Sequence, residues 1–175
     1  MEKIFSSNFI GTHGRELWRF FYEATLRSYG NVNLNKEGPN DETSCETNAN
    51  DDGSNTIVFE KGDWSYSDKY FRDDSFSGTV TISYRSTACF AMVYWGKVLP
   101  HADKTAVYTC LQSALGAIER NHPWRGPDHF VANNELCYTN LWCGKLEKFH
   151  GQEKIDDTDG CRLYEGNYFG GTILR

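Results

Sequence analysis

The stretch that decides the fold is residues 64–99, WSYSDKYFRDDSFSGTVTISYRSTACFAMVYWGKVL. It predicts three consecutive β-strands joined by short turns, because apolar and polar side chains alternate along its first two segments. The third segment, Cys89–Trp95, is apolar at every position and is expected to be a central strand covered on both faces. The stretch therefore predicts an antiparallel meander at the centre of the molecule.

One face of the first strand in this meander carries its most informative residues. Trp64, Tyr66 and Tyr70 share that face with Asp68, since alternate residues of a strand point to the same side. If the face points inward, Asp68 is either paired or functional, because burying an unpaired carboxylate is costly. If it points outward, Asp68 is an ordinary solvated side chain. The sequence leaves both interpretations open.

Two helices and a second group of strands are expected around the meander. Residues 13–29 and 102–120 each repeat apolar side chains at the spacing of one helical face. The expected strands outside the meander are residues 56–60, 129–132, 136–143, 145–150 and 161–169. This order predicts an α+β fold, a curved antiparallel β-sheet with two main helices packed on it. We identify no internal repeat and no linker, so residues 1–175 are expected to form a single domain.

The charge of the chain is concentrated in one segment. The formal net charge is −6, and residues 31–55 hold six acidic side chains, seven Asn and almost no apolar residues. Such a segment cannot bury enough surface to offset its ordering, so a mobile acidic, Asn-rich loop is expected there. The remainder is close to neutral and has no basic stripe, which argues against a nucleic-acid partner.

Compartment and membrane contact follow from the apolar runs and the cysteines. The longest apolar run, Ala88–Trp95, is far too short to span a bilayer, and the first residues do not resemble a secretory signal. The six cysteines include no Cys-x-x-Cys pair, which favours reduced thiols over a zinc ribbon or a redox motif. We therefore expect a cytoplasmic protein with no membrane partner. The sequence leaves the oligomeric state open.

Motifs for catalysis or metal binding are weak in this sequence. Cys143 beside His129 or His150 could form a nucleophilic pair, but six cysteines and five histidines give many accidental pairings. A metal site in the last third of the chain would have to draw on His122, Asp128, His129, His150 and Glu153, which lack the spacing of a known metal motif. We therefore expect no catalytic residue, no metal and no cofactor.

Several short motifs resemble those of a known family. They are Tyr94-x-Gly96, Arg125-Gly126-Pro127, Phe149-x-Gly151-x-Glu153-x-Ile155 and Tyr164-x3-Tyr168-x-Gly170-Gly171-x-Ile173, together with Phe20-Phe21-x2-Ala24 and Tyr29-Gly30. Together they resemble an uncharacterised bacterial domain family of unknown function, which is sometimes fused to helix-turn-helix regulators. The resemblance covers most of the chain. It implies a unit of organisation and no activity.

The high aromatic content, 15% of residues, is the strongest functional signal. Tyr and Trp combine a stacking face with a hydrogen-bonding tip, which suits either a pocket for a planar or sugar-like ligand or an aromatic core. We predict a non-enzymatic small-molecule-binding or sensor-like domain, with a nucleotide-like ligand as one version. The expected ligand-binding residues are Trp64, Tyr66, Asp68, Tyr70, Trp124 and Arg125.

Two other function classes stay open. The first is a protein–protein interaction module that uses the acidic loop or a sheet edge. The second is a small hydrolase-like enzyme, which requires His129, His150, Glu153 or Asp68 to converge in a cleft.

Overall fold

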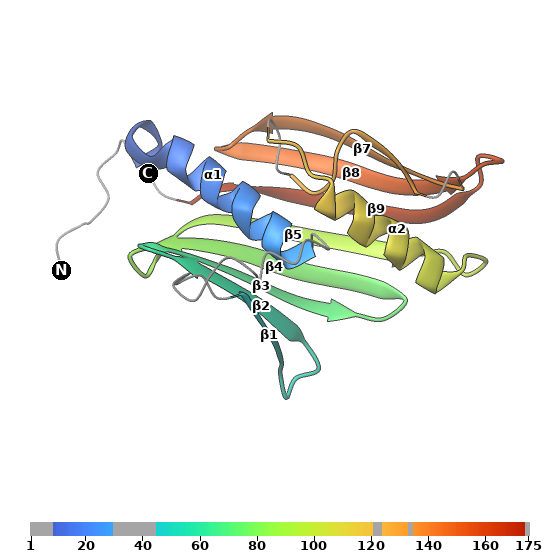
Figure 1. Cartoon of the computed structure of the whole chain (residues 1–175), viewed down its shortest axis with the longest axis horizontal. Coiled ribbons are helices and arrows are strands. Elements are labelled where there is room, and N and C mark those ends of the chain that lie inside the picture. The colour runs from blue at the N-terminus through green and yellow to red at the C-terminus, as the bar shows by residue number, and fades with distance from the viewer. Residues whose placement is uncertain (1–8, 30–44, 121–123, 133–134, 174–175) are drawn as a thin grey trace, which may run out of the picture.

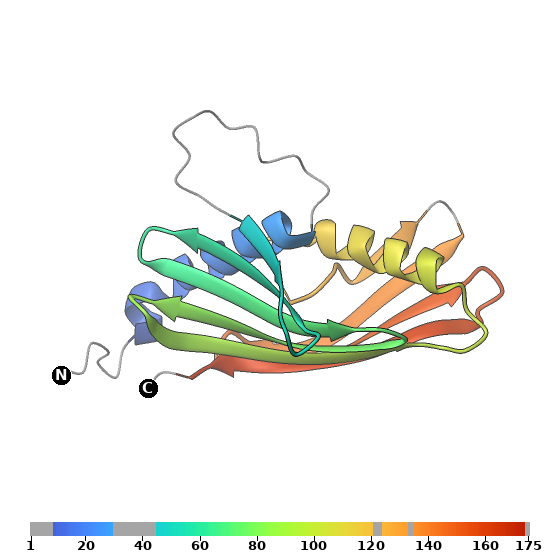
Figure 2. The same ribbon diagram turned by 90° about the horizontal axis from the view of Figure 1, so that it is seen from below.

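The computed structural model describes residues 9–29, 45–120, 124–132 and 135–173, and within these residues nine strands form one antiparallel sheet with two helices on one of its faces (Figure 1). The elements are α1 (Phe9–Tyr29), β1 (Cys45–Ala49), β2 (Asn55–Lys61), β3 (Trp64–Arg72), β4 (Ser75–Tyr84), β5 (Thr87–Val98), α2 (Lys104–Gly116), β6 (His129–Ala132), β7 (Leu136–Lys145), β8 (Lys148–Asp157) and β9 (Arg162–Thr172). The predicted α+β class is confirmed. The sheet is open and not strongly curved, so the prediction of a curved sheet holds only in part (Figure 2).

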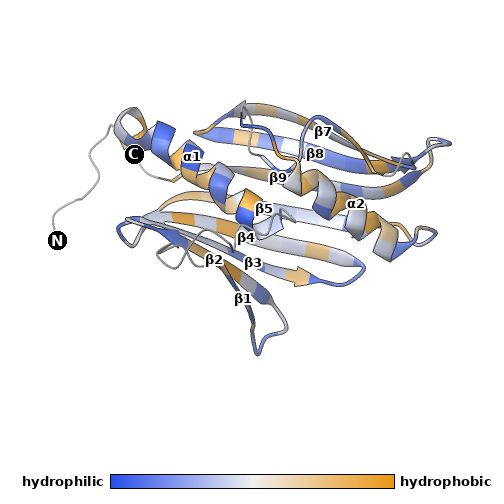
Figure 3. Ribbon diagram, viewed as in Figure 1, coloured by the Kyte–Doolittle hydropathy of each residue, from blue (hydrophilic) through white to orange (hydrophobic). Residues whose placement is uncertain are grey.

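The helices pack on the sheet through the apolar stripes that the sequence predicts. In α1 the buried residues include Leu17, Phe20, Phe21 and Ala24, and hydrophilic and hydrophobic residues alternate along the helix (Figure 3). The helix begins at Phe9, earlier than the predicted residue 13. The shorter α2 begins after Asp103, whose side chain accepts hydrogen bonds from two backbone N–H groups of the first turn.

Part of the segment expected to be a loop is a strand. Residues 45–49 form β1, which pairs antiparallel with β2 through a turn in which Asn50 donates to Ser54 and Thr56. Every residue of β1 is exposed, so backbone pairing with β2 rather than burial holds it in place. The rest of the expected loop, up to residue 44, lies outside the described residues.

The expectation that Cys89–Trp95 is covered on both faces is wrong. The strand β5 is central, since it lies between β4 and β9, but the helices cover one face of the sheet only. On the other face Trp95 is 42% exposed, and Phe71 and Phe169 beside it are exposed as well. An apolar run therefore marks this strand as central without showing that both of its faces are buried.

The topology contains an internal repeat that the sequence did not show us. The strand order is β1-β2-β3-β4-β5-β9-β8-β7-β6, so α1 with β2–β5 and α2 with β6–β9 form two halves that meet at the β5–β9 pair. Both halves run helix, then four-strand meander. The order of strands is the same from each edge to the centre, once β1 is set aside. An approximate twofold axis therefore passes between β5 and β9.

The pairing registers identify equivalent residues in the two halves. Tyr66 pairs with Ile82 in the first half, and Tyr138 pairs with Ile155 in the second. The further equivalent pairs are Phe59 and Phe130, Asp68 and Asn140, Tyr70 and Trp142, Phe76 and Phe149, Gly78 and Gly151, Val80 and Glu153, Phe90 and Tyr164, Tyr94 and Tyr168, and Gly96 and Gly170. Each half also has a register shift directly after its equivalent isoleucine, Ile82 or Ile155.

The side-chain contacts of the two halves are as similar as their strand-pairing registers. A Cβ on Gly78 would lie 2.3 Å from the Tyr94 hydroxyl, and a Cβ on Gly151 would lie 2.2 Å from the Tyr168 hydroxyl. Each glycine therefore leaves room for a tyrosine from the neighbouring strand. The ring centroids of Phe76 and Tyr164 are 5.8 Å apart, as are those of the equivalent pair, Phe149 and Phe90. The sequence motifs that carry this repeat are too short to stand out without the register.

Candidate functional site

Asp68 points into the layer between the helices and the sheet. The side chain is fully buried on β3, and its carboxylate accepts hydrogen bonds from the hydroxyl groups of Tyr29 and Tyr94, the latter at 2.8 Å. It forms no ion pair within the described residues. Burial raises the pKa of Asp68, although the hydrogen bonds from Tyr29 and Tyr94 act in the opposite direction. The structure thus settles the question left by the sequence: Asp68 faces inward and is held by neutral donors.

A buried ion pair lies beside this carboxylate. Arg125 Nε donates to Glu153 Oε1 at 2.5 Å, and Tyr164 donates to the other carboxylate oxygen at 3.3 Å. Both charged side chains are almost completely buried, and the guanidinium carbon of Arg125 lies 4.5 Å from the centre of the Tyr94 ring. Burial lowers the pKa of Arg125, but the charge of Glu153, its hydrogen bond with Arg125 and the nearby Tyr164 and Tyr29 together outweigh this and raise the pKa above its usual value. Arg125 therefore stays charged.

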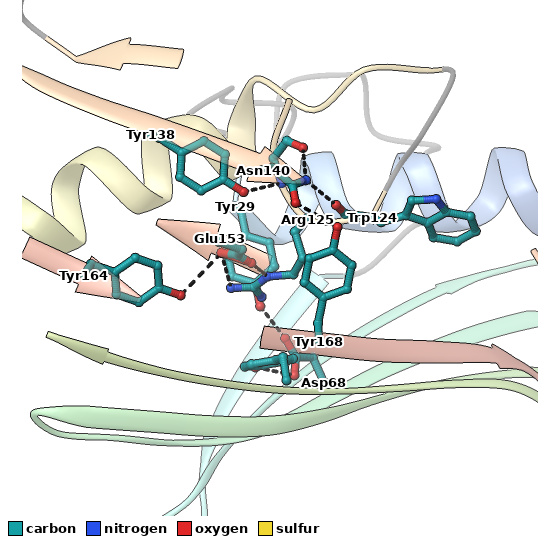
Figure 4. Close-up of polar contacts among 11 residues, drawn as sticks. Tyr29, Asp68, Trp124, Arg125, Tyr138, Asn140, Glu153, Tyr164 and Tyr168 are labelled. Carbon is teal, nitrogen blue, oxygen red and sulfur yellow. Dashed lines mark hydrogen bonds and ion pairs between the residues drawn. The ribbon is translucent and has the colours of Figure 1, made fainter. Parts of the chain in front are cut away.

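Asn140, the residue equivalent to Asp68, has a structural role in the second half. It accepts a hydrogen bond from the Tyr168 hydroxyl at 2.8 Å, the same bond that Asp68 accepts from Tyr94. Its amide group donates to the carbonyl oxygens of Trp124 and Gly126, and so fixes the corner after α2 on the sheet (Figure 4). Both the side-chain oxygen and the side-chain nitrogen of Asn140 thus have hydrogen-bond partners.

A cleft opens beside Asp68 and Arg125, in the first half of the molecule. It has a volume of about 70 Å³ between α2 and the strands β3–β5. Its lining consists of Tyr29, Tyr70, Arg72, Phe76, Tyr94, Tyr108, Leu111, Gln112, Leu115 and Arg125. Arg72 and Gln112 are exposed and lie at the mouth, with the Arg72 guanidinium 4.2 Å from the centre of the Tyr108 ring. The cleft therefore leads from solvent to the tyrosines that hold Asp68.

The structure places the six residues that the sequence proposed for ligand binding in three different settings. Tyr70 and Arg125 line the cleft, and Asp68 lies behind Tyr29 and Tyr94. Tyr66 is buried in the core next to Asp68, and Trp64 packs on Phe20, with ring centroids 5.6 Å apart. The sixth residue, Trp124, is fully buried in the second half of the molecule.

Sequence reasoning missed most of the cleft. The residues it did not propose are Tyr29, Arg72, Phe76, Tyr94, Tyr108, Leu111, Gln112 and Leu115. One signal could have found some of them: an inward Asp68 needs hydrogen-bond donors, and tyrosines on neighbouring elements are the available source. Their distance from Asp68 in the sequence hides the contact.

The residues required for a hydrolase do not converge. His129 and His150 are exposed, beside Cys137 and Cys143 respectively, whereas Asp68 and Glu153 are buried between the sheet and the helices. The Cys143 sulfur lies 3.5 Å from His150 Nε2 on the face of the sheet that carries no helix. Among the described residues, neither buried carboxylate contacts a histidine, so the geometry gives the hydrolase alternative no support.

The described residues give two further findings, on metal sites and on membrane spans. They contain no group of three or more His, Cys, Asp or Glu side chains that could hold a metal ion. His122, one of the ligands considered from the sequence, lies outside the described residues. None of the helices that the structure describes has the length and apolarity needed to cross a membrane.

Replacing Asp68 with asparagine is expected to stabilise the protein increasingly as the pH rises. Since burial raises the pKa of Asp68 in the folded state, the folded chain binds this proton more tightly than the unfolded chain. The contribution of Asp68 to stability is therefore largest below its unfolded pKa and is lost as the pH rises through the folded pKa. Asparagine has no such titration, and the equivalent Asn140 shows that an amide fits this position.

The measurement is the free energy of unfolding in urea between pH 4 and pH 8, for the wild type and Asp68→Asn. The matched control is Asp63→Asn, which removes an exposed carboxylate paired with Arg85. A difference between wild type and Asp68→Asn that stays constant over this range would contradict the assignment of a raised pKa to Asp68.

Comparisons with known proteins give one match. A family model described as a domain of unknown function, DUF5680, matches residues 68–173, from the middle of β3 to the end of β9. The match covers Asp68, α2 and the whole second half. No curated protein and no solved structure matches the chain.

Proposed function

The chain belongs to the DUF5680 family, a domain family of unknown function, and from its cleft we propose that it is a non-enzymatic small-molecule-binding domain with a sensor-like role. The observation that carries the proposal is that the cleft ends at the buried polar groups around Asp68 and Glu153. A space of about 70 Å³ lies over Arg125, Tyr29 and Tyr94, which hold or adjoin two buried carboxylates. Concave sites with a few convergent polar groups are the usual form of small-molecule sites.

The chemistry of the cleft defines the kind of ligand it would accept. Arg72 and Gln112 supply hydrogen-bond donors at the mouth, while tyrosine rings and Leu111 supply the apolar walls. Such a ligand has a flat or apolar body and acceptor atoms at its exposed edge. A nucleotide-like compound, as the sequence suggested, is one version of this chemistry.

The proposed setting is a reducing cytoplasm. All six cysteines are free, which is typical of proteins kept in a reducing compartment. The bacterial, helix-turn-helix-linked setting that the sequence resemblance implies would suit a sensor domain. It forms part of the proposal.

A thermal-shift screen of nucleotides, nucleobases, sugars and small carboxylates tests the proposal. A ligand at a hundred times its Kd adds about 2.7 kcal/mol, which raises the Tm of a chain of this size by about 5–10 °C. Arg72→Ala should abolish the shift, because it removes the donor at the mouth. Arg15→Ala, an exposed arginine of α1, is the matched control and should retain it. A screen without any hit, or a shift unaffected by Arg72→Ala, would refute ligand binding in this cleft.

A second candidate, the protein-interaction module, has one observation in its favour. On the face of the sheet without helices, the exposed apolar side chains include Phe71 at 47%, Trp95 at 42%, Leu141 at 69% and Phe169 at 65%. The sheet also has an exposed edge at β1. Capture of one identified protein by the wild type, and its loss from Trp95→Ser/Phe169→Ser or from a chain lacking residues 36–52, would support this alternative.

A further inference from the structure

The internal repeat gives the strand and helix walls of the cleft equivalents around Trp124, where α1 takes the place of α2 and β7–β8 that of β3–β4. On the strands, Tyr70 and Phe76 correspond to Trp142 and Phe149 through the pairing registers. On the helices, the buried stripe Leu17, Phe20, Phe21 and Ala24 of α1 has the same spacing as Val107, Cys110, Leu111 and Ala114 of α2. Tyr108 therefore corresponds to Trp18, Leu111 to Phe21 and Gln112 to Tyr22.

In the second half this space is filled by an indole ring. Trp124 is 0% exposed and stacks on Phe149, with ring centroids 3.8 Å apart and an angle of 15° between the planes. Trp18 meets it edge-on at 4.8 Å, Phe21 lies at 6.0 Å and Trp142 at 6.5 Å. These four neighbours are the equivalents of Phe76, Tyr108, Leu111 and Tyr70, which line the cleft.

We propose that the cleft binds a planar heteroaromatic compound of the size of indole or purine, stacked on Phe76 as Trp124 is stacked on Phe149. This inference rests on the proposed function and names its ligand class. Among the residues that the structure describes, the walls that enclose the Trp124 ring have equivalents in the cleft, and no equivalent ring lies between them. Aromatic walls of this kind favour a flat π-system, because stacked and edge-on contacts both require one.

The space that Trp124 fills between Phe149, Trp18, Phe21 and Trp142 is called the Trp124 socket. The cleft is more polar than this socket, and the difference favours a ring with polar edges. Within the part of the chain that the structure describes, the buried indole N–H of Trp124 has no hydrogen-bond partner. In the cleft, Arg72 is the equivalent of Gly144 on β7, and Gln112 is the equivalent of Tyr22 on α1. Both provide N–H donors that ring nitrogens, exocyclic oxygens or an acidic substituent can accept. A purine or a substituted indole meets these requirements, whereas a plain hydrocarbon ring does not.

The volume of the cleft is consistent with a partly inserted ring. A cavity of about 150 Å³ can hold a benzene molecule, whereas the cleft has about 70 Å³ and an open mouth. In the proposed complex, the leading edge of a bicyclic ring enters between Phe76 and Leu111. The exposed side chains of Arg72 and Gln112 rearrange around its outer edge.

Calorimetric titration of the full chain with indole-3-acetate, adenine and guanine tests the ligand class, with decahydroquinoline as the non-planar control of similar size. At least one planar probe should bind and decahydroquinoline should not. Phe76→Leu should weaken binding about 5- to 150-fold, the usual range for the loss of one stacking partner. Its matched control, Phe149→Leu, alters the equivalent ring in the second half and should leave the affinity unchanged.

A second variant tests the inference even if the Phe76→Leu chain fails to fold. Leu111→Phe installs the residue found at the equivalent position, Phe21, and fills the cleft from α2. It should abolish binding of the planar probes without lowering the Tm. Binding of the probes that survives in Leu111→Phe would overturn the inference.

The outcomes separate the two proposals. If a non-planar compound from the screen binds, loses affinity in Leu111→Phe, and no planar probe binds, the cleft is a ligand site but the heteroaromatic class is wrong. If neither planar nor non-planar compounds bind, both proposals fail together.

Discussion

Replacing Trp124 with alanine is expected to lower the free energy of unfolding by about 3–5 kcal/mol, the usual cost of removing a large buried aromatic side chain. Trp124 is fully buried and contacts aromatic rings from α1, β5, β7 and β8, so no neighbouring element can collapse into the space it leaves. The measurement is urea unfolding of the wild type and Trp124→Ala. Trp95→Ala, at a tryptophan that is 42% exposed, is the control and should cost much less.

Addition of indole extends this prediction. The variant leaves a socket with aromatic walls, and apolar cavities of this kind bind matching apolar rings. Indole should therefore raise the Tm of Trp124→Ala in a concentration-dependent way. The same measurement is made on the double variant Trp124→Ala/Leu111→Phe, in which the cleft is filled. A rise in its Tm then reports indole bound in the Trp124 socket alone. A loss of stability below 1 kcal/mol for Trp124→Ala would contradict the packing described for the second half.

Replacing Arg125 with methionine is expected to lower the free energy of unfolding by about 3–5 kcal/mol, since it leaves the Glu153 carboxylate buried without its cation. The backbone at Arg125 has a φ of 69°. Methionine also has a Cβ, so any backbone strain at this position is the same in the wild type and the variant. The loss therefore reports on the ion pair. The measurement is again urea unfolding, and Arg125→Lys, which keeps the charge, should lose less.

A double variant isolates the cause of this loss. Val80 occupies the position equivalent to Glu153 in the first half, so valine fits that place in the sheet. Arg125→Met/Glu153→Val removes both charges and should recover most of the stability that Arg125→Met loses, because the Glu153 carboxylate is no longer left buried without its cation. If the double variant is as unstable as Arg125→Met, packing of the arginine side chain rather than its charge is what stabilises the fold.

The elements of the fold could be predicted because their signals are local. Alternation along Trp64–Tyr84 and helical spacing in α1 and α2 report which face of each element is buried, and the structure confirms both. Burial on the second face of β5 was wrongly predicted, because an apolar run cannot show how many layers cover a sheet. The strand β1 was missed because backbone pairing with β2 stabilises it without burial.

The candidate site was predicted less well, since its parts come from distant segments. The strand pattern placed Asp68 on the same face as Trp64, Tyr66 and Tyr70 but left open whether that face points inward, and the structure shows that it does. Its partners Tyr29 and Tyr94 come from α1 and β5, and no local pattern brings them to Asp68. Trp124 and Arg125 are neighbours in the chain, yet Trp124 fills the second half while Arg125 reaches the cleft of the first.

The sequence by itself determined the α+β class, which side chains of an alternating strand share a face and the concentration of aromatic residues, because these depend on periodicity and composition. Only the tertiary structure decided how the two meanders pair through β5 and β9, and with it the equivalence of Asp68 with Asn140 and of the cleft with the Trp124 socket. The physical reason is register. A strand's pattern fixes which side chains point inward, but only hydrogen bonding to a partner strand fixes which residues lie opposite one another.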